Sequence, residues 1–150
     1  MAMGPTPAAL RVLFVCKGNI CRSAAAEAVA RELAGGHVAV RSRGTREWHE
    51  GKPANEMMRD IALGRGYDME SHIAHQLTQS DLCWATLIVA FDDETLTAVK
   101  RQLSSGCSAA LRLFSRDGRD VGDPYGHSAS VFEECFDQIE IGVRQIVDPS

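Results

Sequence analysis

A cysteine and an arginine six positions apart carry the chemistry that this sequence suggests. Cys16 follows the apolar run 10–15, and Arg22 stands just before the alanine-rich stretch 24–28. The order of residue types predicts a strand, a loop and a helix. The first N–H groups and the positive dipole end of such a helix face the loop, which suits a bound phosphate. The helix end and the guanidinium also favour thiolate over thiol at Cys16, and thiolate is the nucleophilic form.

Both residues also have a simpler explanation. A cysteine at the end of a buried strand is often a small core residue, and an arginine in a first helical turn is often a solvated charge. Gly18 and Asn19, however, are the residue types that best tolerate left-handed backbone, and Ser23 stands where the helix begins. These three residues favour a phosphate-binding loop.

The segment from Val15 to Ser23 resembles the phosphate-binding loop of low-molecular-weight protein tyrosine phosphatases, whose motif is C-x-G-N-x-C-R-S. Segments 42–45, 48–53, 71–74 and 123–126 follow in the family's order and approximate spacing, and the Trp-His-x-Gly-x-Pro string is more similar to the bacterial branch. The departures are Lys17 for an aliphatic residue, Ala24 for a proline, Arg43 for a small residue and Phe91 for the methionine common before Asp92. None removes a reacting group.

The resemblance implies hydrolysis of phosphotyrosine and small aryl phosphates through a covalent phosphocysteine, without metal or other cofactor. Cys16 would be the nucleophile, and Arg22 would hold two phosphate oxygens. Asp123 would be the general acid, although Asp-Pro-x-Gly is also a common turn; a stiff turn can hold an acid in place. The other implied site residues are the loop residues Lys17, Gly18, Asn19, Ile20, Cys21 and Ser23, the loop supports Ser42 and His72, and the substrate walls Trp48 and Tyr125.

Several of these side chains have two readings. Ser23 either donates a hydrogen bond to the Cys16 sulfur or only caps the helix, and Cys21 either resolves an oxidised Cys16 as a disulfide or simply packs. If the family resemblance is set aside, Asn19, Ser42 and His72 are interpreted as ordinary turn or surface residues. Trp48 and Tyr125 are then interpreted as exposed aromatic residues without a role. Lys17 either makes the mouth of the site basic, together with Arg43 and Arg46, or points into solvent. Three cysteines beside apolar segments are expected in the core: Cys83, Cys107 and Cys135.

Strand and helix patterns alternate along the chain, which predicts an α/β domain with a parallel sheet covered on both faces. Ligands bind such sheets beyond the carboxyl ends of the strands, where Cys16 stands. The resemblance adds a single-domain three-layer sandwich with a four-stranded, flavodoxin-like sheet. Residues 1–9 are expected to form a flexible tail and 10–150 the phosphatase domain. The expected strands are 10–15, 37–42, 85–90 and 109–114, and the expected helices are 23–33, 53–63, 92–103 and a closing one over 132–146.

Composition limits the function independently. The 150 residues are 45% hydrophobic and 24% charged, as in one globular domain, and the net charge of −4 argues against nucleic-acid binding. The first apolar run is too short for a signal or membrane segment, so a cytoplasmic location is expected. Five cysteines without a zinc-like spacing suit a reducing compartment better than a disulfide framework. The run 92–94 is read as the acidic first turn of a helix rather than as a metal site.

The expected partners are phosphotyrosine proteins, with a bacterial tyrosine kinase as one candidate. Three competing functions stay open. Thioredoxin-linked arsenate reductases share the fold and loop but need a further pair of cysteines, which Cys83 and Cys107 do not resemble. Phosphoarginine phosphatases resemble this chain except for a threonine where Ile20 stands. A binding module or redox sensor would hold phosphate without turnover, against which the intact Cys16, Arg22 and Asp123 argue.

Overall fold

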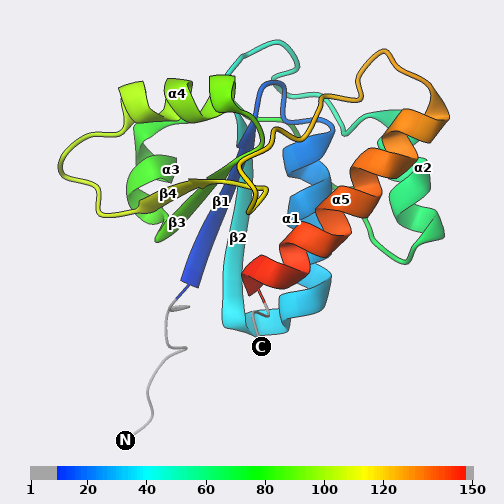
Figure 1. Cartoon of the computed structure of the whole chain (residues 1–150), viewed down its shortest axis with the longest axis horizontal. Coiled ribbons are helices and arrows are strands. Elements are labelled where there is room, and N and C mark those ends of the chain that lie inside the picture. Colours follow the sequence, from blue (N-terminus) through cyan, green and yellow to red (C-terminus); the bar gives the residue numbers. More distant parts are fainter. Residues whose placement is uncertain (1–9, 148–150) are drawn as a thin grey trace, which may run out of the picture.

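A computed structural model describes residues 10–147, so the expected tail 1–9 and residues 148–150 lie outside the described part. Within it, strands and helices alternate (Figure 1). The strands are β1 (Leu10–Cys16), β2 (Val38–Gly44), β3 (Leu87–Ala90) and β4 (Ala110–Leu113). The helices are α1 (Arg22–Ala34), a 3-10 turn (Gly35–His37), α2 (Glu56–Gly64), α3 (Gln79–Trp84), α4 (Asp93–Gln102) and α5 (Ala129–Val147).

The four strands form one parallel sheet in the order β2–β1–β3–β4. Cys16 at the end of β1 pairs with Gly44 at the end of β2. The order in which successive strands are added to the sheet reverses at β1. Strand β2 lies on one side of β1, whereas β3 and β4 lie on the other side. The carboxyl end of β1 is therefore the point at which parallel α/β sheets bind ligands. The predicted α/β fold with a four-stranded parallel sheet is confirmed.

Helices cover both faces of the sheet. Figure 1 shows α1, α2 and α5 on one side and α3 and α4 on the other. Alternate residues of β1 enter two separate cores: Val12 and Phe14 pack toward α1 and α5, whereas Leu13 and Val15 pack toward α3 and α4. Both sets are fully buried, as expected for a central strand covered on two faces.

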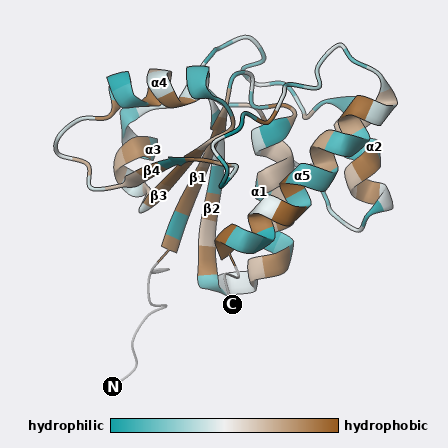
Figure 2. Ribbon diagram, in the orientation of Figure 1, coloured by the Kyte–Doolittle hydropathy of each residue, from teal (hydrophilic) through white to brown (hydrophobic). Residues whose placement is uncertain are grey.

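The closing helix α5 follows the predicted helical spacing of apolar residues. Its buried side includes Phe132, Phe136, Ile139 and Val143. Gly142 lies on this side, where a Cβ atom would come within 2.2 Å of the Phe114 ring beyond β4. Glycine therefore lets α5 pack directly on the end of the sheet. Figure 2 shows hydrophobic residues concentrated in the strands and on the inner helices, while α4 is mostly hydrophilic.

One prediction about helices is wrong, and one helix has no counterpart in the predictions. The helix expected to begin at Pro53 begins at Glu56, because the Asn55 side chain accepts a hydrogen bond from the N–H of Met58 and caps it. Pro53 instead pairs with Ile73 in an antiparallel bridge. Helix α3 was not expected; it begins at a capping box in which Thr78 and Asp81 bond each other's backbone N–H groups. Among residues 10–147, no helix is long and apolar enough to cross a membrane.

Candidate active site

The loop between β1 and α1 forms the base of a cavity. Cys16 ends β1, Arg22 begins α1, and the backbone between them turns through Asn19, whose φ is +59°. The residue before the helix, Cys21, makes no side-chain cap hydrogen bond. Gly44 of β2 lies directly beneath the loop, where a Cβ atom would come within 2.7 Å of the Lys17 carbonyl oxygen. Strand β2 thus supports the loop by close backbone contact.

The Cys16 sulfur makes two hydrogen bonds at the base of this loop. Its Sγ lies 2.9 Å from Ser23 Oγ and 3.3 Å from the Asn19 backbone nitrogen, which donates to it. Ser23 Oγ also accepts a hydrogen bond of 2.8 Å from Asn19 Nδ2, which leaves the Ser23 hydrogen for the sulfur. Ser23 lies inside α1 and does not cap it, so its contact is with the thiol.

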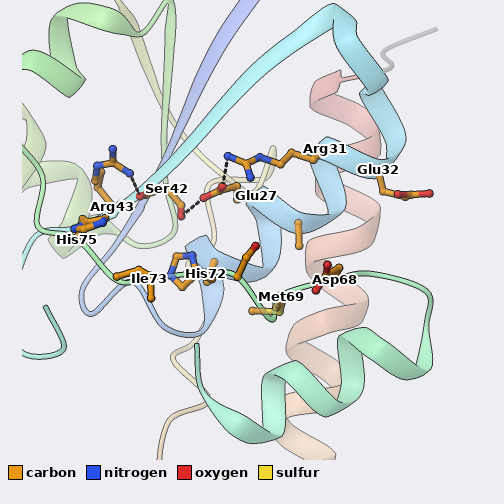
Figure 3. A pocket seen from close by; sticks show the side chains of 13 residues that line it. Glu27, Arg31, Glu32, Ser42, Arg43, Asp68, Met69, His72, Ile73 and His75 are labelled. Carbon is orange, nitrogen blue, oxygen red and sulfur yellow. Dashed lines mark hydrogen bonds and ion pairs between the residues drawn. The ribbon is translucent and has the colours of Figure 1, made fainter. Parts of the chain in front are cut away.

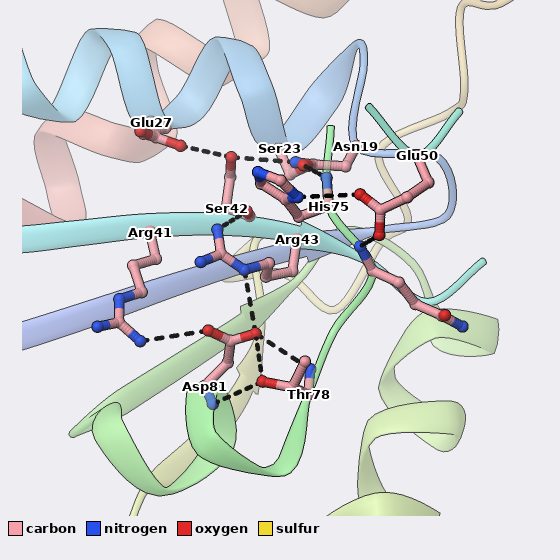
Figure 4. A network of polar contacts seen from close by, with 11 residues as sticks. Asn19, Ser23, Glu27, Arg41, Ser42, Arg43, Glu50, His75, Thr78 and Asp81 are labelled. Carbon is pink, nitrogen blue, oxygen red and sulfur yellow. Dashed lines mark hydrogen bonds and ion pairs between the residues drawn. The ribbon is translucent and has the colours of Figure 1, made fainter. Parts of the chain in front are cut away.

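A chain of hydrogen bonds ties this serine to a carboxylate on α1. Asn19 Nδ2 donates to Ser42 Oγ at 3.0 Å, and Ser42 Oγ donates to Glu27 Oε1 at 2.5 Å (Figure 4). Glu27 also pairs with Arg31 and borders a surface hollow of about 510 Å³ (Figure 3). The Glu27 carboxylate, at one end of this chain, can only accept, so Ser42 donates to it and accepts from Asn19. The same Asn19 nitrogen donates to Ser23, so the Ser23 hydrogen is directed at Cys16.

Two histidine residues hold the backbone around Asn19. His72 Nε2 donates to the Asn19 carbonyl at 2.6 Å, and the backbone N–H of His75 donates to Asn19 Oδ1 at 3.0 Å. Burial lowers the pKa of His72, although its bond to the Asn19 carbonyl and the nearby Glu27 oppose that shift. The ring is therefore mainly neutral at pH 7, with its proton on Nε2. The structure thus places Ser42 and His72 against the loop.

Arg22 is 1% exposed and uses only one edge of its guanidinium for structure. Its Nη1 donates to Asp92 Oδ2 and to the Val121 carbonyl, both at 2.8 Å. Its Nε has no hydrogen-bond partner among the described residues. Burial disfavours the charge, but Cys16, Asp92 and Asp123 outweigh that and raise the pKa of Arg22. Arg22 thus adds a permanent positive charge to the lining of the cavity, with its Nε unpaired among the described residues.

Asp123 lies on the long return segment between β4 and α5. Its Oδ1 accepts from the Tyr125 backbone N–H at 3.1 Å, which closes the expected turn, while its Oδ2 lies 3.8 Å from Arg22 Nη2. The side chain is 40% exposed. Asp123 can therefore stabilise the turn through Oδ1 and still direct Oδ2 toward Arg22.

These residues share one cavity of about 120 Å³. The sequence-predicted residues that line it are Cys16, Gly18, Asn19, Ile20, Cys21, Arg22, Trp48, Asp123 and Tyr125. Trp48 and Tyr125 are both more than half exposed, as expected for aromatic residues at a rim. Burial raises the pKa of the Cys21 thiol well above its usual value, and Cys16 and Asp123 add to the effect. Cys21 is therefore a thiol at neutral pH.

Lys17 and Ser23 are the expected loop residues that do not line this cavity, and Lys17 points away from it toward α4. Its Nζ pairs with Glu94 Oε2 at 2.9 Å, so it is not free in solvent. The expectation that Arg43 joins it at the mouth is wrong, because Arg43 Nε donates to Asp81 Oδ2 at 3.0 Å and its Nη1 to the Ser42 carbonyl (Figure 4). Arg46 does lie beside Lys17, since its backbone N–H donates to the Lys17 carbonyl.

The core assignment of Cys83 is also wrong. Cys83 is exposed, whereas Cys107 is half-buried against the core that contains Leu13 and Val15, and the two cysteines form a disulfide. Cys83 precedes β3 and Cys107 precedes β4 by a few residues each. The disulfide therefore lies near the amino ends of the strands, whereas Cys16 lies at the carboxyl end of β1. Cys135 is buried as expected, and burial raises its pKa to about 12. Among the described residues, no group of three or more His, Cys, Asp or Glu side chains is placed to hold a metal ion.

Three side chains at the site were missed by sequence analysis. The sequence predicts Asp92 only as a helix cap, yet its side chain also binds Arg22. Glu27 was read as part of a helix, and no local pattern distinguishes it from other surface glutamates. His49 lines the cavity, and its ring would lie 2.7 Å from a Cβ atom at position 18, which explains why Gly18 is a glycine. His49 did fall within the quoted Trp-His-x-Gly-x-Pro string.

Comparison with known proteins decides the family. The profile of the low molecular weight phosphotyrosine protein phosphatases matches residues 11–149, nearly the whole chain. The chain belongs to this family. Its expected enzyme class, protein tyrosine phosphatase, is thereby confirmed.

Bacterial relatives of this phosphatase align over most of their length. The low molecular weight protein-tyrosine-phosphatase of Streptomyces coelicolor is 41% identical over 87% of each chain, and phosphatase A of Mycobacterium tuberculosis is 39% identical over 93% of this chain and 90% of its own. Among solved structures, Bacillus subtilis YfkJ has a TM-score of 0.82 at 32% identity over 93% of both chains. Vibrio vulnificus Wzb in complex with benzylphosphonate has a TM-score of 0.86 at 27% identity over 94% of this chain and 99% of its own.

Proposed function

We propose that this phosphatase hydrolyses phosphotyrosine in proteins, and small aryl phosphates, through a phosphocysteine formed on Cys16. The observation that carries the proposal is the pairing of two groups in one cavity. The Cys16 thiol receives hydrogen bonds from Ser23 and Asn19, and the buried Arg22 Nε has no partner among the described residues. A thiolate and an unused guanidinium edge are what an incoming phosphate monoester needs.

In the first step, the Cys16 thiolate attacks phosphorus and the bond from phosphorus to the phenolic oxygen breaks. Arg22 follows two of the phosphoryl oxygens through Nε and Nη2, and the loop N–H groups stabilise the charge that spreads over them. The departing phenolate takes a proton from Asp123. A positioned acid typically contributes ~10²–10⁴ in rate to such a step.

In the second step, water attacks the phosphocysteine. Asp123, now a carboxylate, takes a proton from this water while the bond between sulfur and phosphorus breaks. The sulfur leaves as thiolate, and the Ser23 hydroxyl, 2.9 Å away, donates a hydrogen bond that makes it a better leaving group. One carboxylate thus serves as acid and then as base, and the enzyme returns to its starting state.

An aryl group fits the walls of the cavity. Trp48 and Tyr125 are exposed at its rim, and Ile20 provides an apolar side. The Vibrio vulnificus relative was solved in complex with benzylphosphonate, which combines an aromatic ring with a phosphonate. Isoleucine at position 20 favours an aryl ester over phosphoarginine, because its apolar side chain offers a guanidinium no hydrogen bond.

The competing functions have less support. An arsenate reductase that passes its disulfide from Cys16 needs two further cysteines within reach, but Cys83 and Cys107 are bonded to each other at the opposite edge of the sheet. A non-catalytic binding module would not need Asp123 beside Arg22. We keep phosphotyrosine proteins as substrates and a bacterial tyrosine kinase as a candidate partner.

The proposal is tested by how the rate depends on the leaving group. If Asp123 protonates the departing oxygen, Asp123→Asn slows the hydrolysis of aryl phosphates whose phenols have a high pKa by ~10²–10³-fold. The hydrolysis of nitrophenyl phosphates slows far less. The measurement is kcat/KM for a series of aryl phosphates, in the wild type and the variant. Glu134→Gln, which removes an exposed carboxylate on α5, is the matched control. An equal loss for every leaving group in Asp123→Asn would assign Asp123 to the turn alone.

A further inference from the structure

A second cavity adjoins the phosphate-binding loop on the side of Lys17. It has a volume of about 360 Å³ and lies between the loop, the segment after β2 and one side of α4. Its lining residues are Lys17, Thr45, Arg46, Glu94, Thr95, Ala98, Arg101 and Gln102. Nothing in the proposed reaction uses this cavity.

The cavity is basic although the whole chain is acidic. Three cations line it, and one carboxylate faces them. Glu94 lies 2.9 Å from Lys17 Nζ and 3.9 Å from Arg46 Nη2, so it is shared by both. Arg101 has no ion-pair partner in the described part of the chain. The cavity therefore has two more cations than carboxylates, which attracts an anionic group.

The second cavity lies next to the first, because neighbouring residues of the loop line the two. Lys17 stands between Cys16 and Gly18, which line the catalytic cavity. The Arg46 backbone N–H donates to the Lys17 carbonyl at 2.9 Å, and the Arg46 guanidinium lies 5.7 Å from the centre of the Trp48 ring. Trp48 itself lines the catalytic cavity. A polypeptide whose phosphotyrosine entered the first cavity over Trp48 would have Arg46 and Lys17 beside it.

We propose that this cavity binds the carboxylate side chain of an Asp or Glu near the phosphotyrosine of a protein substrate. Glu94 holds the place of that carboxylate in the unliganded enzyme. Its side chain is 64% exposed, so its ion pairs are weak and a substrate carboxylate displaces it at little cost. The inference rests on the proposed tyrosine phosphatase activity and names the protein substrates it prefers.

The test compares phosphotyrosine peptides that have alanine at every flanking position with peptides that have one aspartate, moved through each flanking position in turn. The selectivity is the ratio of kcat/KM for the acidic peptide to that for the alanine peptide. We expect a ratio above one at the positions that reach the cavity, falling with added salt as exposed charges are screened. Arg101→Gln should lower this ratio about threefold and Glu94→Gln should raise it about threefold, the size of an exposed ion pair.

Matched variants separate the cavity from the overall charge. Arg119→Gln and Glu134→Gln make the same charge changes at exposed positions outside the cavity and should leave the ratio unchanged. Hydrolysis of a small aryl phosphate should be equal in Arg101→Gln, Glu94→Gln and the wild type, and its absence from all of them would count against the proposed function instead. Unchanged selectivity in Arg101→Gln and Glu94→Gln, or an equal change in the matched controls, would overturn the inference.

Discussion

Asn19 shows how one residue can hold the whole loop in shape. Its φ of +59° is a backbone conformation that costs most residues energy and that glycine adopts freely. Asparagine is present instead because its amide makes three hydrogen bonds that glycine lacks: to Ser23, to Ser42 and from the His75 backbone. These bonds offset the strain and also orient the Ser23 hydroxyl toward Cys16.

The difference between the free thiols can be measured directly. At pH 7, brief treatment with iodoacetamide should alkylate Cys16 first, because burial raises the pKa values of Cys21 and Cys135 and keeps both as unreactive thiols. Mass spectrometry of the peptides gives the extent of modification at each site. Inorganic phosphate should slow the reaction at Cys16 by filling the loop. Labelling of Cys21 as fast as Cys16 would contradict this assignment.

At the residue scale, the sequence predicted what is local. Cys16, the loop and Arg22 lie within eight positions, and their types alone indicate an anion site. Asp92 contacts Arg22 from 70 positions away, and Glu27 contacts Ser42 from 15 positions away, so only the fold brings these pairs together. Lys17 needed the same information, since its partner Glu94 lies on α4.

At the scale of elements, the start of α4 serves two purposes through Asp92. Its Oδ1 accepts from the Thr95 N–H and caps the helix, while its Oδ2 binds Arg22. Burial opposes ionisation of Asp92, but the bonds from Thr95 and Arg22 outweigh it and lower its pKa. The folded state therefore binds this proton less readily than the unfolded state, so the stabilisation is complete above pH ~4 and is lost as the pH falls through the lowered pKa.

We therefore expect Asp92→Asn to reduce the free energy of unfolding by about 3 kcal/mol at pH 6, because it leaves Arg22 buried without its counter-charge. The variant should also lose less stability than the wild type between pH 5 and pH 3, since it lacks the titrating group. Urea unfolding at each pH measures both effects. Asp93→Asn, the exposed neighbour on the same helix, is the control. Parallel pH profiles for Asp92→Asn and the wild type would contradict the role given to Asp92.

Element prediction succeeded where the pattern was long. All four strands and the helices α1, α4 and α5 were expected close to their observed bounds, because buried strands and amphipathic helices have clear periodicity. Helix α3 has only six residues, too few to establish a period. The start of α2 was misplaced because Pro53 suggested a first turn, whereas the Asn55 side chain forms the cap two residues later.

At the scale of the whole molecule, the site draws on residues from 16 to 125 and on both faces of the sheet. Any anion that binds the loop stabilises the complete fold, since the unfolded chain has no such site. Inorganic phosphate at 100 times its dissociation constant should add about 2.7 kcal/mol to the free energy of unfolding. That corresponds to a rise of a few degrees in Tm for a domain of this size.

Two variants separate binding from chemistry in that experiment. Cys16→Ser should show a phosphate-dependent rise in Tm but no turnover of an aryl phosphate, because the loop and Arg22 remain while the nucleophile is lost. Arg22→Lys should lose most of the rise, measured from its own Tm without phosphate, since lysine keeps the charge but not the fork. Turnover by Cys16→Ser would rule out the covalent mechanism, and a full rise in Arg22→Lys would remove Arg22 from phosphate binding.

The disulfide between Cys83 and Cys107 has a consequence for the amount of folded enzyme in a cell. It closes a loop of 24 residues that contains β3 and α4, and so restricts the unfolded chain. In the chain-entropy description, such a cross-link is worth about 3 kcal/mol. Because Cys83 is exposed, the thiol pool around the protein can reach the bond. Reductants would then set how many molecules survive proteolysis, while each folded molecule keeps the same catalytic loop.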